Sequence, residues 1–314
     1  MSLRDKIIQM DLFGAFTILA AVICLLLALQ WGGVTKAWDN SDVYGTLIGF
    51  GLIIIAFLVF EVWRGDSGLL VPQILAKRFV WVACAFNFFL AGSFFVLLYY
   101  LPIYFQAILG ASAQSSGIRN IALIIPVMIF EIATGGLMSK LGYASPFIIL
   151  GGIITTIGMG MIYSSFGVGT SSAAWIGYQV LAGVGIGLAY QSPMMNAEAL
   201  AKNEDMASTT SIILFFQSLG GAVLISTAQS IFENRLIASL PKYAPGIDYA
   251  KVSLAGATGL RDAFSAEELP GILQSYMDGL SAAFVMCIAL AGIAACIGLF
   301  MPWTNLRNKQ DHVA

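Results

Sequence analysis

The stretch Trp175-Ile-Gly-Tyr-Gln-Val-Leu-Ala-Gly-Val-Gly-Ile-Gly-Leu-Ala-Tyr-Gln-Ser-Pro193 is long and apolar enough to cross a bilayer, and it carries no charge. In water, glycines in a helix cost about 1 kcal/mol each relative to alanine. In a membrane they let helices approach closely, and Gly183 and Gly187 have the small-xxx-small spacing for such contact. The amides of Gln179 and Gln191 are costly in lipid unless they face a partner helix or a wet cavity. The sequence therefore predicts an inward-facing, closely packed helix, with packing residues Gly183, Gly185 and Gly187.

The composition of the chain predicts an all-α polytopic membrane protein. Of its 314 residues, 59% are hydrophobic and only 10% are charged, whereas a soluble domain has about 25% charged residues. The net charge of -2 argues against nucleic acid as a partner. There is no Walker A motif, dinucleotide fingerprint or Cys/His cluster with metal-ligand spacing. The only histidine is His312, so we expect neither an enzyme nor a metal site nor an organic cofactor.

Eight apolar runs are candidate spans, and the first is too long for the apolar core of a signal peptide. They are 12–29, 44–63, 80–104, 118–138, 146–166, 175–194, 207–231 and 280–303. One connection is long, the predicted external loop 233–277. Within it, Ser265-Ala-Glu-Glu268 has the form of a capping box and predicts a surface helix that leads into the last span.

The distribution of Lys and Arg predicts that both termini are cytoplasmic. With a cytoplasmic N-terminus, nine basic residues fall on that side and six on the other. The nine are Arg4, Lys6, Arg64, Lys77, Arg78, Lys140, Lys202, Arg307 and Lys309.

Glu131 is a carboxyl group well inside a predicted span, and an ionisable residue at that depth is a functional candidate. It is either a proton-accepting or cation-facing carboxylate that lines a cavity, or a protonated or paired glutamate at a helix interface. Pro126 lies five residues earlier and frees a backbone carbonyl, as expected where a helix borders a cavity.

Other polar and aromatic side chains leave two interpretations open. Amides such as Asn87 and Gln217 either bind substrate or make interhelical hydrogen bonds, and for any one of them the second is favoured. Gln217 is close to Gly220 and Gly221, which suggests a packed seam. The aromatic residues of the third span either line a pocket or face lipid, and lipid-facing positions are favoured for most.

Five motifs in order resemble the C-terminal part of the fungal 14-spanner drug:proton antiporters of the major facilitator superfamily, the toxin-efflux type. They are Leu25-Leu-Leu-Ala-Leu-Gln-Trp-Gly-Gly33, Leu101-Pro-Ile-Tyr-Phe-Gln106, Gly110-Ala-Ser-Ala-Gln-Ser-Ser-Gly-Ile-Arg119, Trp175-Ile-Gly-Tyr-Gln179 and Phe216-Gln-Ser-Leu-Gly-Gly221. In that family two six-helix halves flank an inserted helix pair. The resemblance implies that residues 1–79 are the inserted pair and residues 80–314 the C-terminal six-helix half.

This chain also departs from the family pattern at several points. The run Gly135-Gly-Leu-Met-Ser-Lys-Leu-Gly142 resembles a degenerate copy of the cytoplasmic gating loop, with Ser139 at its acidic position. The corresponding gating residues are Gly135, Gly136, Lys140 and Gly142. Glu131 has no counterpart in the family pattern. No N-terminal six-helix half is present, so the chain is either a fragment or a truncated gene model, or it pairs with a separate N-terminal half or with another copy.

Together these features predict proton-coupled export of small organic molecules by alternating access, with this chain as one part of the transporter. The substrate-cavity candidates are Gln179, Gln191, Gln217, Glu131 and Asn87. The expected location is the plasma membrane rather than the vacuolar membrane. The alternative is a truncated membrane protein that does not transport and acts only by association with other helices.

Overall fold

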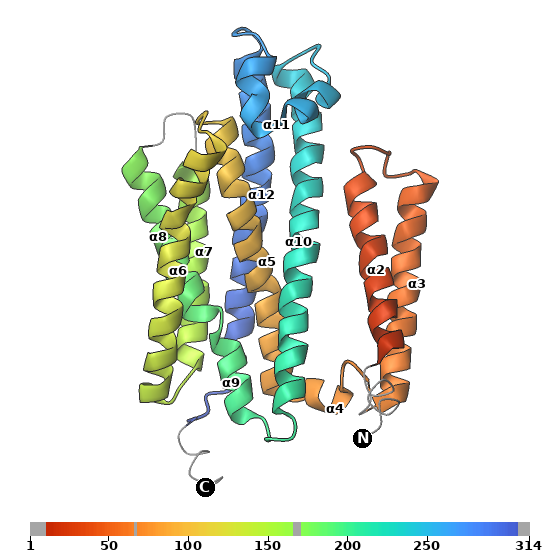
Figure 1. Ribbon diagram of the computed structural model, residues 1–314, viewed down its shortest axis with the longest axis vertical. Helices are drawn as coiled ribbons and strands as arrows, with labels where there is room; N and C mark the ends of the chain where they lie inside the picture. The colour runs from red at the N-terminus through yellow and green to blue at the C-terminus, as the bar shows by residue number, and fades with distance from the viewer. Residues whose placement is uncertain (1–10, 66–67, 166–170, 307–314) are drawn as a thin grey trace.

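The computed structural model describes residues 11–65, 68–165 and 171–306, and these form a helical bundle (Figure 1). The helices are α2 (Leu12–Trp31), α3 (Ser41–Arg64), α4 (Pro72–Leu75), α5 (Arg78–Ala107), α6 (Ala113–Leu141), α7 (Ser145–Ser165), α8 (Ser172–Ala189), α9 (Ser192–Leu200), α10 (Met206–Tyr243), α11 (Tyr249–Ala263) and α12 (Leu269–Gly298). Four of the basic residues used to predict orientation (Arg4, Lys6, Arg307 and Lys309) lie outside the described residues, as does His312.

Eight helical segments are long and apolar enough to span a membrane, and one of them consists of α8 and α9 together. The prediction of an all-α bundle with eight spans is confirmed. Local sequence sets several of the ends. The side chain of Asn40 caps α3 by accepting from the Asp42 amide, and that of Ser112 caps α6 by accepting from Ser115. Gly142 ends α6 in the left-handed conformation, with φ of 78°.

The central helix of the bundle is α5, which packs against both α10 and α12 (Figure 1). Its aromatic side chains correct the expectation that most of them face lipid. Phe86, Tyr100, Tyr104 and Phe105 are all buried inside the protein, whereas Tyr99 is 53% exposed. They face inward because α5 is surrounded by other helices, a tertiary feature that a hydropathy pattern does not contain.

The stretch 233–277, predicted as a loop, is mostly helical. α10 continues past its apolar part to Tyr243, α11 follows, and α12 begins at Leu269. The capping box has the geometry that the sequence predicts: the Ser265 N–H donates to Glu268 Oε2 (3.0 Å) and the Glu268 N–H donates to Ser265 Oγ (3.4 Å). The predicted surface helix and the last span are one continuous helix.

The helices α2 and α3 form a pair that stands beside the bundle (Figure 1). They pack on each other, and α2 also contacts α10. Their outer faces are apolar and exposed: Phe16 is 74% and Trp63 is 81% accessible. Such faces suit contact with lipid.

Candidate functional site

The helix that contains the quoted stretch is interrupted at Tyr190 and Gln191, between α8 and α9. Pro193 explains the interruption, because it has no N–H to donate to a carbonyl one turn earlier. Upstream of it, the Tyr190 N–H still donates to the Ile186 carbonyl oxygen at 2.8 Å. The sixth predicted span is therefore two helices, α8 and α9.

A cavity of about 500 Å³ lies at this interruption. It is formed by side chains from α5, from the α8–α9 junction and from α10. The lining residues are Phe95, Tyr190, Gln191, Gln217, Ser218, Gly221, Ala222 and Ile225. Two of the five cavity candidates, Gln191 and Gln217, are therefore brought together here. Four of the eight lining residues carry polar side chains, namely Tyr190, Gln191, Gln217 and Ser218. Convergent polar groups beside apolar surface are typical of sites for small organic ligands.

Tyr190 lines the cavity, whereas Glu131 does not. The Tyr190 ring stacks edge-on against Phe94, with centroids 5.6 Å apart. Its hydroxyl is next to the Gln217 side chain and within electrostatic reach of the Glu131 carboxylate. Glu131 itself is half-buried on α6. The cavity itself is offered amides by Gln191 and Gln217 and a phenol by Tyr190.

Gln179 and Asn87 lie in the packed interior and do not line this cavity. The Gln179 amide nitrogen donates to the Trp175 carbonyl oxygen of its own helix at 3.0 Å, and its Oε1 has no hydrogen-bond partner. Asn87 is 2% exposed, and neither of its amide atoms has a partner.

The glycines of α8 lie where neighbouring backbones approach closely. A β-carbon on Gly183 would be 2.5 Å from the Leu123 carbonyl oxygen of α6, and one on Gly187 would be 2.5 Å from that of Val127. Gly183 and Gly187 thus face α6, next to the Pro126 turn.

The opposite side of α8 packs against α7. A β-carbon on Gly185 would be 2.6 Å from the Thr155 hydroxyl oxygen and 2.9 Å from the Gly151 carbonyl oxygen. On α10, a β-carbon on Gly221 would be 2.9 Å from the Phe95 ring, and one on Gly220 would collide with the Phe88 backbone of α5. Each of these contacts requires a residue without a side chain.

The predicted gating residues lie at the end of α6 and in the turn after it. Gly135 and Gly142 line a small cavity of about 160 Å³ with residues of α9 and the C-terminal segment. Gly136 and Lys140 are exposed. The Gly142 carbonyl oxygen accepts from the Leu306 N–H at 2.8 Å, which fixes the C-terminal segment to this turn.

The sequence did not single out Tyr190, Ser218, Ala222 or Ile225 as cavity residues. The sequence spacing of the residues on α10 could have identified them. Gln217, Gly221 and Ile225 recur every four residues and so share one face of a helix, as do Ser218 and Ala222 beside them. For Tyr190 the signal is Pro193, which interrupts the helix next to it.

Comparison with known proteins places the chain among transporters. The family model of the Major Facilitator Superfamily matches residues 10–225. The "MFS-type transporter GME11371" of Pestalotiopsis microspora is 48% identical over 309 residues, which are 98% of this chain and 56% of that protein. The "Probable efflux pump gsfJ" of Penicillium aethiopicum is 40% identical over 303 residues, 96% of this chain and 54% of that one. The chain thus spans about half the length of the curated relatives it matches.

A solved structure shares the fold. It is a bacterial homologue of the human lysosomal transporter Spinster, in an inward-facing and occupied conformation. The TM-score is 0.61 at 18% sequence identity, over 85% of this chain and 59% of that one. The sequence match over most of the chain and this shared helical fold lead to one conclusion: the chain belongs to the Major Facilitator Superfamily, a family of membrane transporters and not of enzymes.

Proposed function

We propose that this chain supplies the substrate-binding part of a transporter that exports small organic molecules by alternating access. The observation that carries the proposal is the cavity at the α8–α9 interruption, where Gln191, Gln217 and Tyr190 present polar groups beside apolar surface. Membrane-spanning helices that are interrupted are typical of transporter binding sites. The direction, export, rests on relatives that are named efflux pumps.

In this proposal the coupling ion is a proton and Glu131 is its acceptor. Glu131 is the carboxylate within electrostatic reach of Tyr190, which lines the cavity. A proton on Glu131 changes the charge next to the cavity, so substrate and proton affect each other's binding. Gln179 and Asn87 are packed inside and do not line the cavity, so they do not touch substrate in this proposal.

The proposed architecture follows the family. α2 and α3 are the inserted pair, and α5 to α12 are the C-terminal half, which works against an N-terminal six-helix half or another copy. Both termini are on the cytoplasmic side, and the protein acts in the plasma membrane. The loop of Gly135, Gly136, Lys140 and Gly142 then lies on the cytoplasmic side, where it gates the inward-open state.

Dye transport by inside-out vesicles tests the proposal. The vesicles come from cells that make the full natural product of this gene, and a lipophilic fluorescent dye and a pH gradient are supplied. We expect Gln217→Ala to lower transport by about tenfold, the effect of losing one good hydrogen bond to the ligand. The matched control is Gln229→Ala on the same helix, because Gln229 bonds to Glu233 and does not line the cavity.

Proton coupling is tested by Glu131→Gln, which should abolish the response to the pH gradient while the protein still binds dye. The exposed Glu267 provides the control Glu267→Gln. A pH response that survives in Glu131→Gln would overturn the role of Glu131. No dye movement by the natural product, despite normal expression, would instead favour the alternative of a membrane protein that acts only by helix association.

A further inference from the structure

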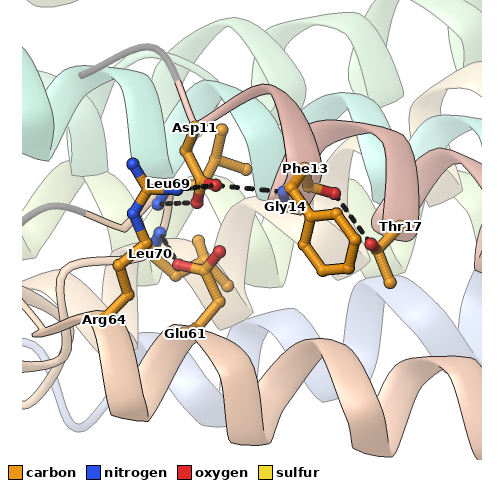
Figure 2. Close-up of polar contacts among 8 residues, drawn as sticks. All are labelled: Asp11, Phe13, Gly14, Thr17, Glu61, Arg64, Leu69 and Leu70. Carbon is orange, nitrogen blue, oxygen red and sulfur yellow. Dashed lines mark hydrogen bonds and ion pairs between the residues drawn. The ribbon is translucent and has the colours of Figure 1, made fainter. Parts of the chain in front are cut away.

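A second polar cluster lies at one end of the α2–α3 pair (Figure 2) and shares no residue with the lining of the cavity. Asp11 caps the start of α2, and Glu61 and Arg64 are in the last turn of α3. Both carboxylic side chains are only 2% exposed. Burial of an ionised carboxylate is costly unless each oxygen is hydrogen-bonded or paired.

Three of the four carboxylate oxygens have partners. Asp11 Oδ1 accepts from the Gly14 N–H at 3.0 Å and from Arg64 Nη1 at 2.6 Å. Asp11 Oδ2 accepts from the Leu69 N–H at 3.1 Å, and Glu61 Oε2 accepts from the Leu70 N–H at 2.7 Å. The fourth oxygen, Glu61 Oε1, is buried and has no hydrogen-bond partner among the residues that the structure describes.

This fourth oxygen faces the other carboxylate. A β-carbon on Gly14 would be 2.6 Å from Glu61 Oε1 and 2.5 Å from Asp11 Oδ2, so both oxygens occupy the space above Gly14. Both are acceptors, and two ionised carboxylates so placed repel each other. A proton between them removes one negative charge and supplies the donor that Glu61 Oε1 lacks.

We propose that Asp11 and Glu61 form a proton-binding site that holds one shared proton. Binding takes one proton from the aqueous phase and turns a carboxylate pair into a carboxylic acid hydrogen-bonded to a carboxylate. The Arg64 guanidinium balances the charge that remains.

The proton controls how the chain after α3 is attached. The amides of Leu69 and Leu70 donate to the two carboxyl groups, one each, and so fasten the segment that leads into α4 and α5. With the proton bound, both acceptors stay in place. Without it, repulsion between the carboxylates separates them and loosens this segment.

The neighbouring helix α10 makes its polar contact with the α2–α3 pair away from the two carboxyl groups. α10 also packs on α2, and there Asn234 donates to the Gly32 carbonyl oxygen beyond the opposite end of α2. Among the residues that the structure describes, the charged groups with contacts at this site are Asp11, Glu61 and Arg64. The site is independent of Glu131 and of the proposed export.

Hydrogen exchange of the Leu69 and Leu70 amides tests the site in the full protein in detergent. After correction for the intrinsic exchange rate, protection of both amides should fall by about tenfold from mildly acidic to mildly alkaline buffer. In Glu61→Gln the carboxamide donates permanently to Asp11, so protection should stay high throughout. Glu267→Gln, at an exposed position, should behave like the wild type.

Infrared spectroscopy supplies a readout that does not depend on the opening of the segment. The spectrum of the wild type minus that of Glu61→Gln, and the spectrum of the wild type minus that of Asp11→Asn, should both contain the carbonyl stretch of a buried protonated carboxyl group at mildly acidic pH. Any band from another carboxyl group, such as Glu131, cancels in these difference spectra. The proposal is wrong if neither difference spectrum contains this band. It is equally wrong if Leu69 and Leu70 show the same pH dependence in Glu61→Gln as in the wild type.

Discussion

Gly187 offers a sharp test of how closely α8 packs on α6. A β-carbon there would be 2.5 Å from the Val127 carbonyl oxygen, a backbone atom that cannot move aside. We expect Gly187→Ala to lower the free energy of unfolding by about 1–3 kcal/mol, the usual cost of overpacking. Gly177 is on the same helix with no atom within 4 Å of its β-position. Gly177→Ala should therefore be neutral or stabilise by about 0.5–1 kcal/mol.

The measurement is unfolding of both variants in detergent beside the wild type. Equal effects of the two substitutions would show that helix propensity, and not contact between backbones, determines the cost. Such a result would contradict the packing described for α8.

Asn87 carries two amide atoms that have no hydrogen-bond partner within the described part of the chain. A buried polar group without a hydrogen bond costs about 1–3 kcal/mol. Replacement by leucine, which has a similar volume, should therefore raise the free energy of unfolding by about that amount. Thermal unfolding of Asn87→Leu measures it. Ser93 on the same helix is bonded to the Cys287 carbonyl oxygen, so Ser93→Ala should destabilise and serves as the contrast. A destabilised Asn87→Leu would mean that the amide holds a ligand or water.

The cavity could be anticipated from the sequence only in part. Gln191 and Gln217 stand out because an amide in an apolar run needs a reason to be there. Tyr190 does not stand out, because a tyrosine in a membrane protein has many ordinary roles. Gln179 has the same signal as Gln191 but bonds to its own helix. Which way a side chain faces depends on helix packing, and the pattern along one helix does not specify it.

The start of α12 depends on pH through Glu268. Hydrogen bonds from the Ser265 amide and hydroxyl hold the pKa of Glu268 below its ordinary value. A carboxyl group whose pKa is lowered in the folded state stabilises that state above its ordinary pKa of about 4.3. This contribution is lost as the pH falls through the lowered pKa. We expect exchange protection of residues 265–272 to fall severalfold upon acidification.

Two substitutions separate the capping box from general effects of acid. Glu268→Gln keeps an acceptor for the Ser265 amide but cannot titrate, so the fall in protection should disappear. The neighbouring Glu267 is exposed, and Glu267→Gln should keep it. If the fall persists in Glu268→Gln, a different group sets the acid sensitivity of this end of α12.

The ends of a helix can be predicted from the sequence where a proline, a capping residue or the end of an apolar run marks them. They cannot be predicted where the helix continues past such a run. Most spans differ from their predicted bounds by a few residues, because long apolar runs mark the part of a helix that lipid requires. α10 and α12 extend well beyond their runs, since a helix that leaves the membrane continues with polar residues. The connection 233–277 contains more helix than predicted for this reason, since α10 and α12 both extend into it. The break between α8 and α9 was predictable from Pro193 alone.

The α2–α3 pair is fastened to the bundle through few contacts (Figure 1). At the turn after α2, Asn234 of α10 donates to the Gly32 carbonyl oxygen at 3.0 Å and to the Ser230 carbonyl oxygen of its own helix at 2.8 Å. Gly33 has a φ of 76°, and a β-carbon on it would collide with Asn234. The exposed apolar faces of the pair add no attachment to the bundle. The Asn234 amide is thus one link between the two parts, beside the buried apolar packing of Ile18 and Phe57 in a cluster with bundle residues.

Asn234→Ala should release this turn and leave the bundle intact. One hydrogen bond contributes about 0.5–1.5 kcal/mol, so exchange of the turn amides at Gly33 and Lys36 should rise by severalfold to about tenfold. Amides in the buried middle of α5 should not change. Thr227→Ala is the matched control, because Thr227 bonds only to the Val223 carbonyl oxygen of its own helix in the contacts described. If exchange rises throughout α5 as well, the pair and the bundle unfold as one unit; if the turn is unaffected, Asn234 is not its anchor.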